Sequence, residues 1–455
     1  MNLFLSINPF TEKQFASFET ISDKRLDEVL EITYQAQKSW KNIPVSGRAK
    51  LFLNLAVLLK KNVSKLAEIA TLEMGKTLVE AKAEVMKCAA CCEFYAANAE
   101  RFLEAEITKT ADGKGVHLIY EPLGIVLGIF PWNFPYWQIA RSVVPVVIGG
   151  NAMLIKPAPN VPQCSMALQN IFVEAGFPVG VVQTIFATEG QVEKIIADDR
   201  IHACTLTGSE KAGSLVASNA AKQIKKSVLE LGGSDPFIVL DDADLDLAIS
   251  NAITSRFQNN GQSCIGAKRF ILHEKIAGEF LEKLITGTAN LKMGDPMESY
   301  TNIGPLARKD LLEKLRTQVD DSVKQGAKIL FQQKENTSKG FFYPPTILTD
   351  IPKSSPAYRE ELFGPVISIF VFSEIADAIR VANDTSFGLG AAIWTKNLES
   401  GKAIASQLQC GTVFINGMVK SDPAFGFGGV KRSGYGRELG SQGLREFCNL
   451  KVLRF

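Results

Sequence analysis

The middle of the chain alternates short apolar runs with helical stretches, and this alternation constrains the fold more than any other feature. The apolar runs cover residues 123–130, 152–155, 181–186, 202–205 and 227–229. We interpret them as strands of a parallel sheet, because a strand–helix–strand unit returns the chain in the same direction and covers both faces of the sheet. The sequence therefore predicts an α/β fold of the nucleotide-binding type.

Further elements are predicted on both sides of this region. The first hundred residues carry apolar positions at helical spacing and indicate amphipathic helices. Residues 107–110 and 116–120 alternate around Asp112-Gly113, which is typical of a β-hairpin turn. A second strand–helix series places strands near 236–240, 269–273, 366–372 and 411–415. Because 455 residues exceed the roughly 250–300 that one core supports, we expect two or three domains.

The charge balance narrows the class of partner. Fifty Lys and Arg residues face 48 Asp and Glu residues, and no block of a single sign stands out. This argues against a nucleic acid or an anionic membrane as the main partner and favours a small molecule. The longest apolar stretch, residues 142–150, is shorter than the ~20 residues of a membrane span, and no secretory signal is recognised. We therefore expect a cytoplasmic protein with reduced cysteines.

Two motifs resemble a zinc site and a phosphate loop, but each lacks residues that such a site requires. Cys88 and Cys91 have the C-x2-C spacing of zinc sites, but no second pair follows and the surroundings indicate a helix, so we expect Cys88, Cys91 and Cys92 to pack in a core. Gly75-Lys76-Thr77 resembles the end of a phosphate loop, yet residue 70 is alanine where that motif needs glycine. With only three histidines in the chain, no catalytic metal is expected.

Three other runs carry residues that together suit attack on a carbonyl. Cys264 closes the run Asn259-Asn260-Gly261-Gln262-Ser263-Cys264, Glu230 opens Glu230-Leu231-Gly232-Gly233, and Asn133 is central in Pro131-Trp132-Asn133-Phe134-Pro135. A thiol is a nucleophile, a carboxylate is a base, and a side-chain amide donates to a developing oxyanion. A cofactor-independent cysteine hydrolase and a catalytically idle binding protein remain as alternatives.

A phosphate-binding element is less clear. The G-x-G-x-x-G fingerprint is absent from the sequence. Gly208-Ser209 follows the strand expected at 202–205 and opens a helix, so its backbone N–H groups suit a pyrophosphate. Ser209 as an ordinary helix cap is the equal alternative.

Taken together, the runs resemble the NAD(P)-dependent aldehyde dehydrogenase family over essentially the whole chain. The matching pieces are Pro131-Trp132-Asn133-Phe134-Pro135, Lys156-Pro157-Ala158, Gly208-Ser209, Glu230-Leu231-Gly232-Gly233, Gly261-Gln262-Ser263-Cys264, Glu361-Leu362-Phe363-Gly364-Pro365 and residues 428–438. The resemblance implies that Cys264 is the nucleophile and Glu230 the general base. It also implies that Asn133, with the backbone N–H of Cys264, holds the oxyanion. The presence of Glu230 favours hydrolysis of the acyl-enzyme and hence irreversible oxidation.

The same resemblance implies a nicotinamide cofactor. The residues implied to bind it are Trp132, Lys156, Pro159, Gly208, Ser209, Leu231, Glu361 and Phe363. NAD-specific members tend to carry a glutamate three positions after the lysine, where this chain has Pro159. Without that negative charge a 2′-phosphate is not repelled, so the sequence leaves NAD and NADP open.

Arg141 carries the substrate prediction. The resemblance places it in the aldehyde pocket with Phe134, Gln258 and Phe427, and its planar guanidinium suits a substrate carboxylate. Shorter bacterial semialdehyde dehydrogenases resemble the chain here, which favours succinate semialdehyde. Several succinate-semialdehyde enzymes have an arginine where Gln258 stands, so glutarate semialdehyde or a broader aldehyde range stays open. A structural salt bridge is the alternative role for Arg141.

The family resemblance also implies a domain layout. Residues 1–106 and 128–230 would bind the cofactor, 231–417 would form the catalytic domain, and 418–433 would border the substrate entrance. Residues 107–127 and 434–455 would form an oligomerisation element, because a lone hairpin leaves open strand edges. We expect a homodimer or a homotetramer.

Overall fold

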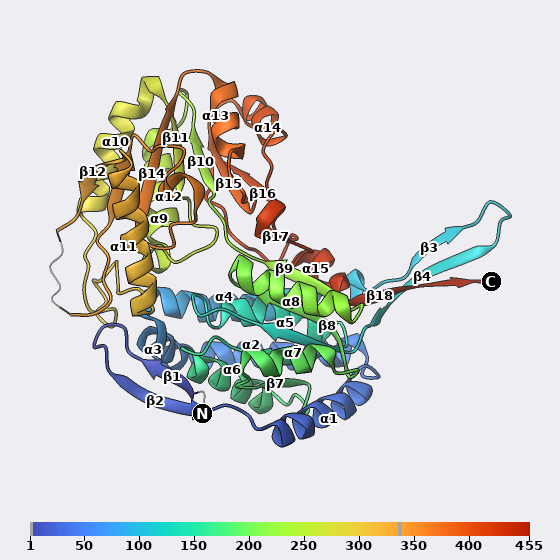
Figure 1. Cartoon of the computed structure of the whole chain (residues 1–455). Coiled ribbons are helices and arrows are strands. Elements are labelled where there is room, and N and C mark those ends of the chain that lie inside the picture. The colour runs from blue at the N-terminus through green and yellow to red at the C-terminus, as the bar shows by residue number, and fades with distance from the viewer. Residues whose placement is uncertain (1–2, 335–338) are drawn as a thin grey trace.

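The computed structural model describes residues 3–334 and 339–455. Two residues at the start of the expected 1–106 segment, and residues 335–338 of the expected 231–417 segment, lie outside the described residues. Figure 1 shows two α/β layers, one above the other, and a slender arm of strands that projects to one side. The fold class expected from the sequence is confirmed.

The first layer is built on a sheet with the strand order β17-β9-β8-β5-β6-β7 within the described residues. All five predicted strands of the middle region are present and parallel, and only β17 runs antiparallel. Register pairs Thr207 of β8 with Glu230 of β9, which places Glu230 at the carboxyl end of its strand. The strands are β5 (Ile125–Ile129), β6 (Ala152–Lys156), β7 (Val182–Thr184), β8 (Ile201–Thr207), β9 (Lys226–Glu230) and β17 (Gly434–Tyr435).

Helices cover this sheet, as the predicted strand–helix alternation requires. Those that follow its strands are α5 (Trp137–Ile148), α6 (Pro162–Glu174), α7 (Glu189–Ala197) and α8 (Glu210–Lys222). The amino-terminal helices are α1 (Asp23–Trp40), α2 (Val45–Lys61), α3 (Val63–Met74) and α4 (Leu78–Phe102), and α15 (Gly440–Glu446) comes near the end of the chain. The sequence did not predict the antiparallel pair β1 (Leu3–Ile7) and β2 (Gln14–Glu19).

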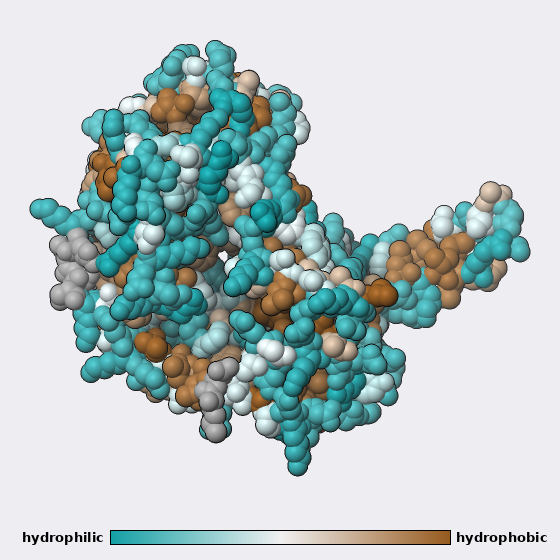
Figure 2. All heavy atoms as spheres, viewed as in Figure 1, coloured by the Kyte–Doolittle hydropathy of each residue, from teal (hydrophilic) through white to brown (hydrophobic). Residues whose placement is uncertain are grey.

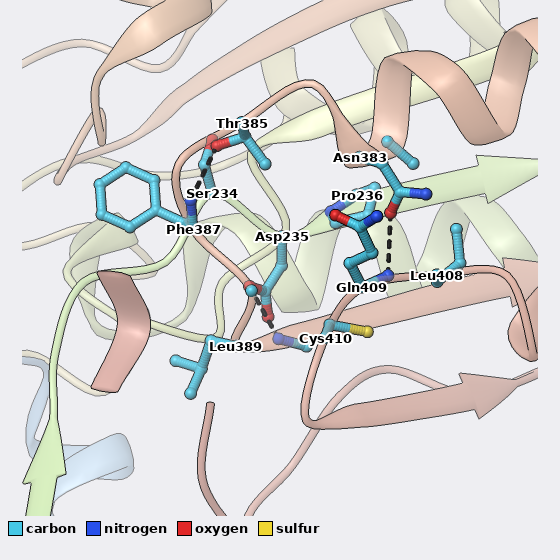
Figure 3. A pocket seen from close by; sticks show the side chains of 13 residues that line it. Ser234, Asp235, Pro236, Asn383, Thr385, Phe387, Leu389, Leu408, Gln409 and Cys410 are labelled. Atoms are coloured by element: carbon cyan, nitrogen blue, oxygen red, sulfur yellow. Dashed lines mark hydrogen bonds between the residues drawn. The ribbon is translucent and has the colours of Figure 1, made fainter. Parts of the chain in front are cut away.

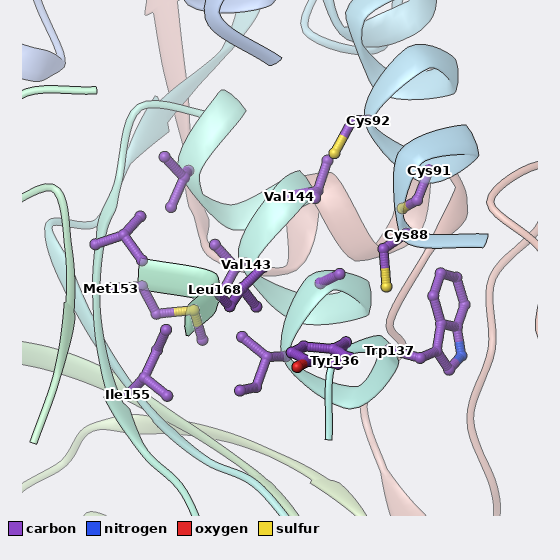
Figure 4. Packing of buried hydrophobic residues seen from close by; sticks show 14 of the residues in the cluster. Cys88, Cys91, Cys92, Tyr136, Trp137, Val143, Val144, Met153, Ile155 and Leu168 are labelled. Atoms are coloured by element: carbon purple, nitrogen blue, oxygen red, sulfur yellow. The ribbon is translucent and has the colours of Figure 1, made fainter. Parts of the chain in front are cut away.

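The largest core cluster lies where α4 packs against α5. Cys88, Cys91 and Cys92 are fully buried on α4, and Figure 4 shows Cys88 beside Trp137 and Cys92 near Val144. The three cysteines therefore serve as small apolar side chains, which confirms the packing role expected for them.

The second layer has the strand order β12-β13-β14-β11-β10-β15-β16 within the described part of the chain. The four predicted strands are present, while β12, β13 and β15 were not predicted. The strands are β10 (Pro236–Val239), β11 (Arg269–His273), β12 (Lys328–Gln332), β13 (Thr346–Thr349), β14 (Val366–Phe372), β15 (Gly390–Trp394) and β16 (Thr412–Ile415). The helices are α9 (Leu245–Phe257), α10 (Glu274–Ala289), α11 (Lys309–Lys324), α12 (Pro356–Arg359), α13 (Ile375–Asn383) and α14 (Leu398–Ala405), with short 3₁₀ turns η1 (Gln258–Gly261) and η2 (Lys431–Ser433).

The projecting arm consists of the predicted hairpin and the end of the chain. Strands β3 (Glu106–Lys109), β4 (Gly115–Pro122) and β18 (Cys448–Arg454) form one antiparallel sheet in the order β18-β4-β3. Figure 2 shows an apolar patch along this arm, where Ile107, Val452 and Phe455 are exposed. Among the helices of the described residues, none has the length and apolar character that crossing a membrane requires.

Candidate active site

The loop that carries Cys264 has an unusual backbone. Asn259, Asn260 and Gly261 have φ values of 54°, 57° and 75°, in the left-handed region. Asparagine tolerates this region better than other residues with a side chain, and glycine enters it freely. A Cβ atom on Gly261 would lie 2.4 Å from the carbonyl carbon of Gly364. The Asn-Asn-Gly run is therefore what allows the loop to turn tightly between α9 and β11.

Two buried cations brace this loop. Arg256 donates from its guanidinium to the backbone oxygens of Gly261 at 2.9 Å and Leu362 at 3.1 Å. The Lys268 ammonium donates to the oxygens of Ser263 at 2.8 Å and Cys264 at 2.9 Å. Both side chains are almost fully buried. Positive charge is thus held directly behind the nucleophile loop.

Cys264 itself is partly exposed and is a free thiol. Burial of the sulfur raises the pKa of Cys264, and the cations of Arg141 and Lys268 oppose this rise only in part. The thiol therefore stays protonated at neutral pH until a base accepts its proton.

A pH profile tests this state of the thiol. Alkylation of Cys264 by iodoacetamide is expected to accelerate with pH and to reach its midpoint above ~8.5, the value of an ordinary cysteine. The reason is that the thiolate is the reacting form and that burial raises its pKa. Alkylation rates of the Cys264 peptide, followed by mass spectrometry from pH 6 to 10, give the midpoint. A midpoint below 8.5 would show that the cations outweigh burial.

The structure brings Asn133 next to the nucleophile loop. Its side-chain nitrogen donates to the backbone oxygen of Gln262 at 3.1 Å, and the Asn259 amide donates to the backbone oxygen of Asn133 at 2.8 Å. Asn133 is buried. An amide nitrogen carries two hydrogens, so one remains for an oxyanion formed at Cys264.

Glu230 approaches the same loop from the first layer. Gly233, three residues further on, packs against it so closely that a Cβ there would lie 2.6 Å from the Cys264 oxygen. The Glu230 carboxylate is buried, and neither of its oxygens has a hydrogen-bond partner among the described residues. Burial raises the pKa of Glu230 well above its ordinary value, although Arg141 counteracts this. A buried, unpartnered carboxylate that acts electrostatically on the Cys264 thiol fits a general base.

Space for this carboxylate comes from the glycine-rich run at residues 426–436. A Cβ on Gly428 would lie 2.8 Å from Oε1 of Glu230. The predicted substrate residue Phe427 is buried next to Gly428, and its ring lies 4.8 Å from the Arg141 guanidinium carbon. The run therefore shapes the site on the side of Glu230 as well as joining β16 to β17.

Arg141 lies between two carboxylates. It forms a buried ion pair with Glu438 through Nε and donates from Nη2 to the Thr207 hydroxyl at 3.3 Å. Burial opposes its charge, but the carboxylates of Glu438 and Glu230 outweigh burial and raise the pKa of Arg141. The salt bridge considered as the alternative role of Arg141 is thus present. Since these contacts use Nε and Nη2, contact of Nη1 with a substrate carboxylate stays a prediction.

The residues predicted to bind the nicotinamide side of the cofactor are brought together. Trp132 and Phe363 meet edge to face with ring centroids 5.7 Å apart. Glu361 accepts from the Gly233 N–H at 3.0 Å and lies 3.4 Å from the Lys268 ammonium. Glu361 therefore joins the nucleophile loop to the segment that carries Glu230.

The residues predicted for the adenosine side of the cofactor lie at or just after the carboxyl ends of β6 and β8 in the first sheet. Lys156 is half buried at the end of β6, with its ammonium 5.5 Å from the Phe4 ring, while Pro159 is exposed. Ser209 caps α8 by accepting from the Ala212 N–H at 3.3 Å. The helix-cap role considered for Ser209 is thus present. A cation, the other N–H groups at the start of α8 and the lack of an acidic side chain at 159 suit a phosphorylated ribose and a pyrophosphate.

Three predicted residues show no specific contact of this kind. Leu231 is buried and packs against Gly213 of α8, where a Cβ would lie 2.6 Å from it. Gln258 is half buried at the start of η1, and Phe134 lies under the Lys76 ammonium at 4.0 Å. Their roles toward cofactor or substrate stay predictions.

A small hollow lies near the site and is lined by none of the predicted site residues. Figure 3 shows Asp235, Leu389, Gln409 and Cys410 around it, and its volume is ≈ 10 Å³. This is room for about one water molecule. A wider groove of ≈ 360 Å³ between α3 and α6 includes none of the predicted site residues.

Sequence reasoning missed Arg256, Lys268 and Glu438. All three are charged yet buried, and Glu438 meets Arg141 only through the fold. Lys268 and Arg256 had a signal in the sequence, since each is a charge within an apolar segment that flanks Cys264. A buried charge needs partners, and here the partners are the loop carbonyls.

The fold and the site define an α/β oxidoreductase class in which a nucleotide-binding sheet meets a second sheet that presents a cysteine. The aldehyde dehydrogenase family profile matches residues 2–453, and the chain belongs to that family. A probable succinate-semialdehyde dehydrogenase [NADP(+)] of Synechocystis sp. is 46% identical over 448 residues, 98% of each chain. Succinate-semialdehyde dehydrogenase [NADP(+)] 1 of Mycobacterium tuberculosis is 44% identical over 450 residues, again 98% of each.

A solved structure agrees with these relatives. The crystal structure of succinic semialdehyde dehydrogenase from Streptococcus pyogenes in complex with NADP+ has a TM-score of 0.97 and 36% identity, and 99% of each chain is covered. The expected family and fold are therefore confirmed. The alternatives of a cofactor-independent cysteine hydrolase and of an idle binding protein lose their support.

Proposed function

We propose that this chain oxidises succinate semialdehyde to succinate with NADP+ as the hydride acceptor. The observation that carries the proposal is Arg141, a buried cation that acts electrostatically on the Cys264 thiol and whose Nη1 takes no part in the contacts with Glu438 and Thr207. Relatives that cover nearly the whole chain at 44–46% identity bear the name of this activity. The substrate carboxylate would pair with Arg141 while its aldehyde group reaches Cys264.

The chain's own groups supply the steps of this reaction. Glu230 takes the thiol proton, and the Cys264 thiolate adds to the aldehyde to give a thiohemiacetal whose oxyanion Asn133 holds. Bound NADP+ would accept the hydride from this carbon. Glu230 then releases the thiol proton to solvent and, as a carboxylate again, deprotonates the water that attacks the thioester; the Cys264 sulfur leaves, takes up a proton, and succinate is released.

We assign the expected domain layout to these roles. Residues 1–106 and 128–230 bind the cofactor, residues 231–417 carry Cys264, and residues 418–433 border the substrate entrance. In support, Lys156 ends β6 and Ser209 follows β8 of the first sheet, while the nucleophile loop precedes β11 of the second.

A rate panel tests the proposed substrate and cofactor. We expect kcat/KM to be highest for succinate semialdehyde with NADP+, followed by glutarate semialdehyde, and at least tenfold lower for butanal, because a charge-assisted hydrogen bond contributes about 1.5–3 kcal/mol. Half-buried Gln258 is the feature that favours glutarate semialdehyde as the second candidate. A preference for butanal would reject the proposal.

Arg141→Leu tests the carboxylate contact. It is expected to lower kcat/KM for succinate semialdehyde about 10- to 100-fold more than for butanal, because only the former has a carboxylate. A smaller loss shared by both aldehydes is expected as well, because the Arg141 cation opposes the pKa rise of Glu230 and Cys264. Since the single change strands Glu438 without its cation, the control is Arg141→Leu with Glu438→Gln, which leaves neither member of the buried pair charged. Equal losses for both aldehydes in the double variant would remove Arg141 from substrate binding.

Pro159→Glu tests the cofactor preference. The new carboxylate is expected to weaken NADP+ binding relative to NAD+ by about tenfold or more, because it would repel a 2′-phosphate. The Pro159 carbonyl accepts from Leu5 N–H at 3.0 Å through the backbone, so the fold does not depend on this side chain. Calorimetric titration with both cofactors gives the ratio, and Pro159→Gln is the neutral control. An unchanged ratio would place the 2′-phosphate elsewhere.

We further propose that the arm joins copies of the chain into a dimer or tetramer. Ile107, Leu450, Val452, Leu453 and Phe455 expose apolar surface on β3, β18 and the final residue of the chain. Such an unprotected sheet edge favours pairing with another strand. Light scattering after size-exclusion chromatography measures the mass of the assembly, and a monomer at micromolar concentration would contradict the proposal.

A further inference from the structure

The corner between α3 and α4 contacts the loop that carries Cys264 and the segment that follows Asn133. It contains Gly75-Lys76-Thr77, the run that fails as a phosphate loop. Gly75 ends α3 with φ 82°, and Thr77 caps α4 by accepting from the Glu80 N–H at 3.3 Å. Lys76 is completely buried between them. Burying an ammonium group costs free energy unless partners compensate, so Lys76 is expected to have a specific role here.

On one side the corner holds the nucleophile loop. The Asn260 side chain donates to the Gly75 oxygen at 3.0 Å, and the Asn259 N–H donates to the Glu80 carboxylate at 2.6 Å. Asn259 and Asn260 are the two asparagines in the left-handed region. These hydrogen bonds therefore help to fix the strained turn that precedes Cys264.

On the other side the corner holds the start of α5. Oε1 of Glu84 accepts from the backbone N–H groups of Tyr136 and Trp137, both at 2.8 Å. Its second oxygen accepts from the Lys76 ammonium at 2.5 Å, and both side chains are buried. A carboxylate at a helix start binds free N–H groups and matches the positive end of the helix dipole. Asn133 lies three residues before Tyr136.

We propose that Glu84, held by Lys76, is a positioning residue that fixes the first turn of α5 and thereby aims the Asn133 amide at the carbonyl attached to Cys264. The inference rests on the proposed function, since it takes Asn133 as the oxyanion donor. Apolar side chains often replace a buried ion pair without loss of stability. Two N–H groups that need an acceptor explain why this pair is charged.

Two charge-free double variants separate this role from stability. Lys76→Met with Glu84→Gln keeps an oxygen that can accept from Tyr136 and Trp137, whereas Lys76→Met with Glu84→Met does not. Neither double variant leaves an unpaired charge from this pair in the core, so both are expected to fold. We expect the Gln variant to keep the burst rate of NADPH formation within about fivefold of the unmodified protein. The Met variant should lose about 100-fold, the effect of misplacing or removing one oxyanion donor.

Two further readouts show whether the loss acts through Asn133. In the Met variant, succinate semialdehyde and butanal should lose the same factor, because the oxyanion is common to both. Alkylation of Cys264 by iodoacetamide should stay within threefold, because that reaction forms no oxyanion. The matched control removes the exposed ion pair between α2 and α4, with Lys60→Met and Glu93→Gln, and should leave every rate unchanged.

Asn133→Ala distinguishes failure of the inference from failure of the proposed function. If this change lowers the burst rate and the two double variants differ by at least tenfold, the inference stands. If Asn133→Ala lowers the rate but the two double variants agree within threefold, the positioning role of Glu84 is wrong. If Asn133→Ala has no effect, the proposed oxyanion donor is wrong and the inference falls with it.

Discussion

Replacing Cys264 with alanine is expected to reduce aldehyde oxidation at least 10⁴-fold, because without the sulfur no thiohemiacetal forms. Binding of NADP+ should stay within threefold of the unmodified protein, since no residue proposed for the adenosine side contacts this thiol. Steady-state formation of NADPH and calorimetric titration give the two quantities. Cys264 is partly exposed on its loop, so loss of its side chain should leave the fold intact.

Cys410 offers a matched control for this change. It is another partly exposed thiol of the second layer, and burial raises its pKa as it raises that of Cys264. Cys410→Ala is expected to keep full activity because Cys410 borders only the small hollow next to Asp235. Residual oxidation in Cys264→Ala above one part in 10³, or a large loss in Cys410→Ala, would move the nucleophile away from Cys264.

Glu230→Gln should separate the two halves of the reaction. We expect steady turnover to fall about 10²- to 10⁴-fold, the usual contribution of a general base, because glutamine cannot deprotonate the hydrolytic water. The acylation half needs only one proton transfer from the thiol, so raising the pH should restore its rate. Stopped-flow absorbance at pH 9 should then show a burst of NADPH close to one per site, followed by almost no turnover.

The pH dependence of the unmodified protein has a definite sign. Burial raises the pKa values of both Glu230 and Cys264, and both groups react in their deprotonated forms. Turnover should therefore rise with pH through the neutral range, and the Glu230 part of this rise should be absent in Glu230→Gln. Undiminished steady turnover in that variant would exclude Glu230 as the base. If turnover rises with pH in the same way in the unmodified protein and in Glu230→Gln, the rise comes from the thiol alone.

Much of the fold was predictable because buried parallel strands are continuous apolar runs. β5, β6 and β8 are of this kind, and their predicted positions agree with the structure to within a few residues. β15 escaped prediction since Gly-Ala-Ala-Ile-Trp has few β-branched residues. β12 escaped because Lys328 and Gln332 bound an exposed edge strand. Burial by neighbouring elements, rather than local preference, decides such strands.

The site was predictable where a residue type performs chemistry in a short motif. Cys264, Glu230 and Asn133 were proposed on that basis, and the structure brings their loops together. The pairing of Arg141 with Glu438 was not predictable, because the two residues lie on α5 and near β17 and meet only in the folded chain. The same holds for Lys76 and Glu84, whose function depends on which N–H groups the fold places opposite them.

Mass spectrometry of the enzyme quenched in acid during turnover tests the central claim most directly. With Glu230→Gln, succinate semialdehyde and NADP+, we predict a succinyl group on the peptide that contains Cys264, at close to one per chain. The adduct should be absent when NADP+ is omitted and the sample is quenched in acid, since the thiohemiacetal reverts. A succinyl group on any other peptide, or none while NADPH forms, would contradict the account.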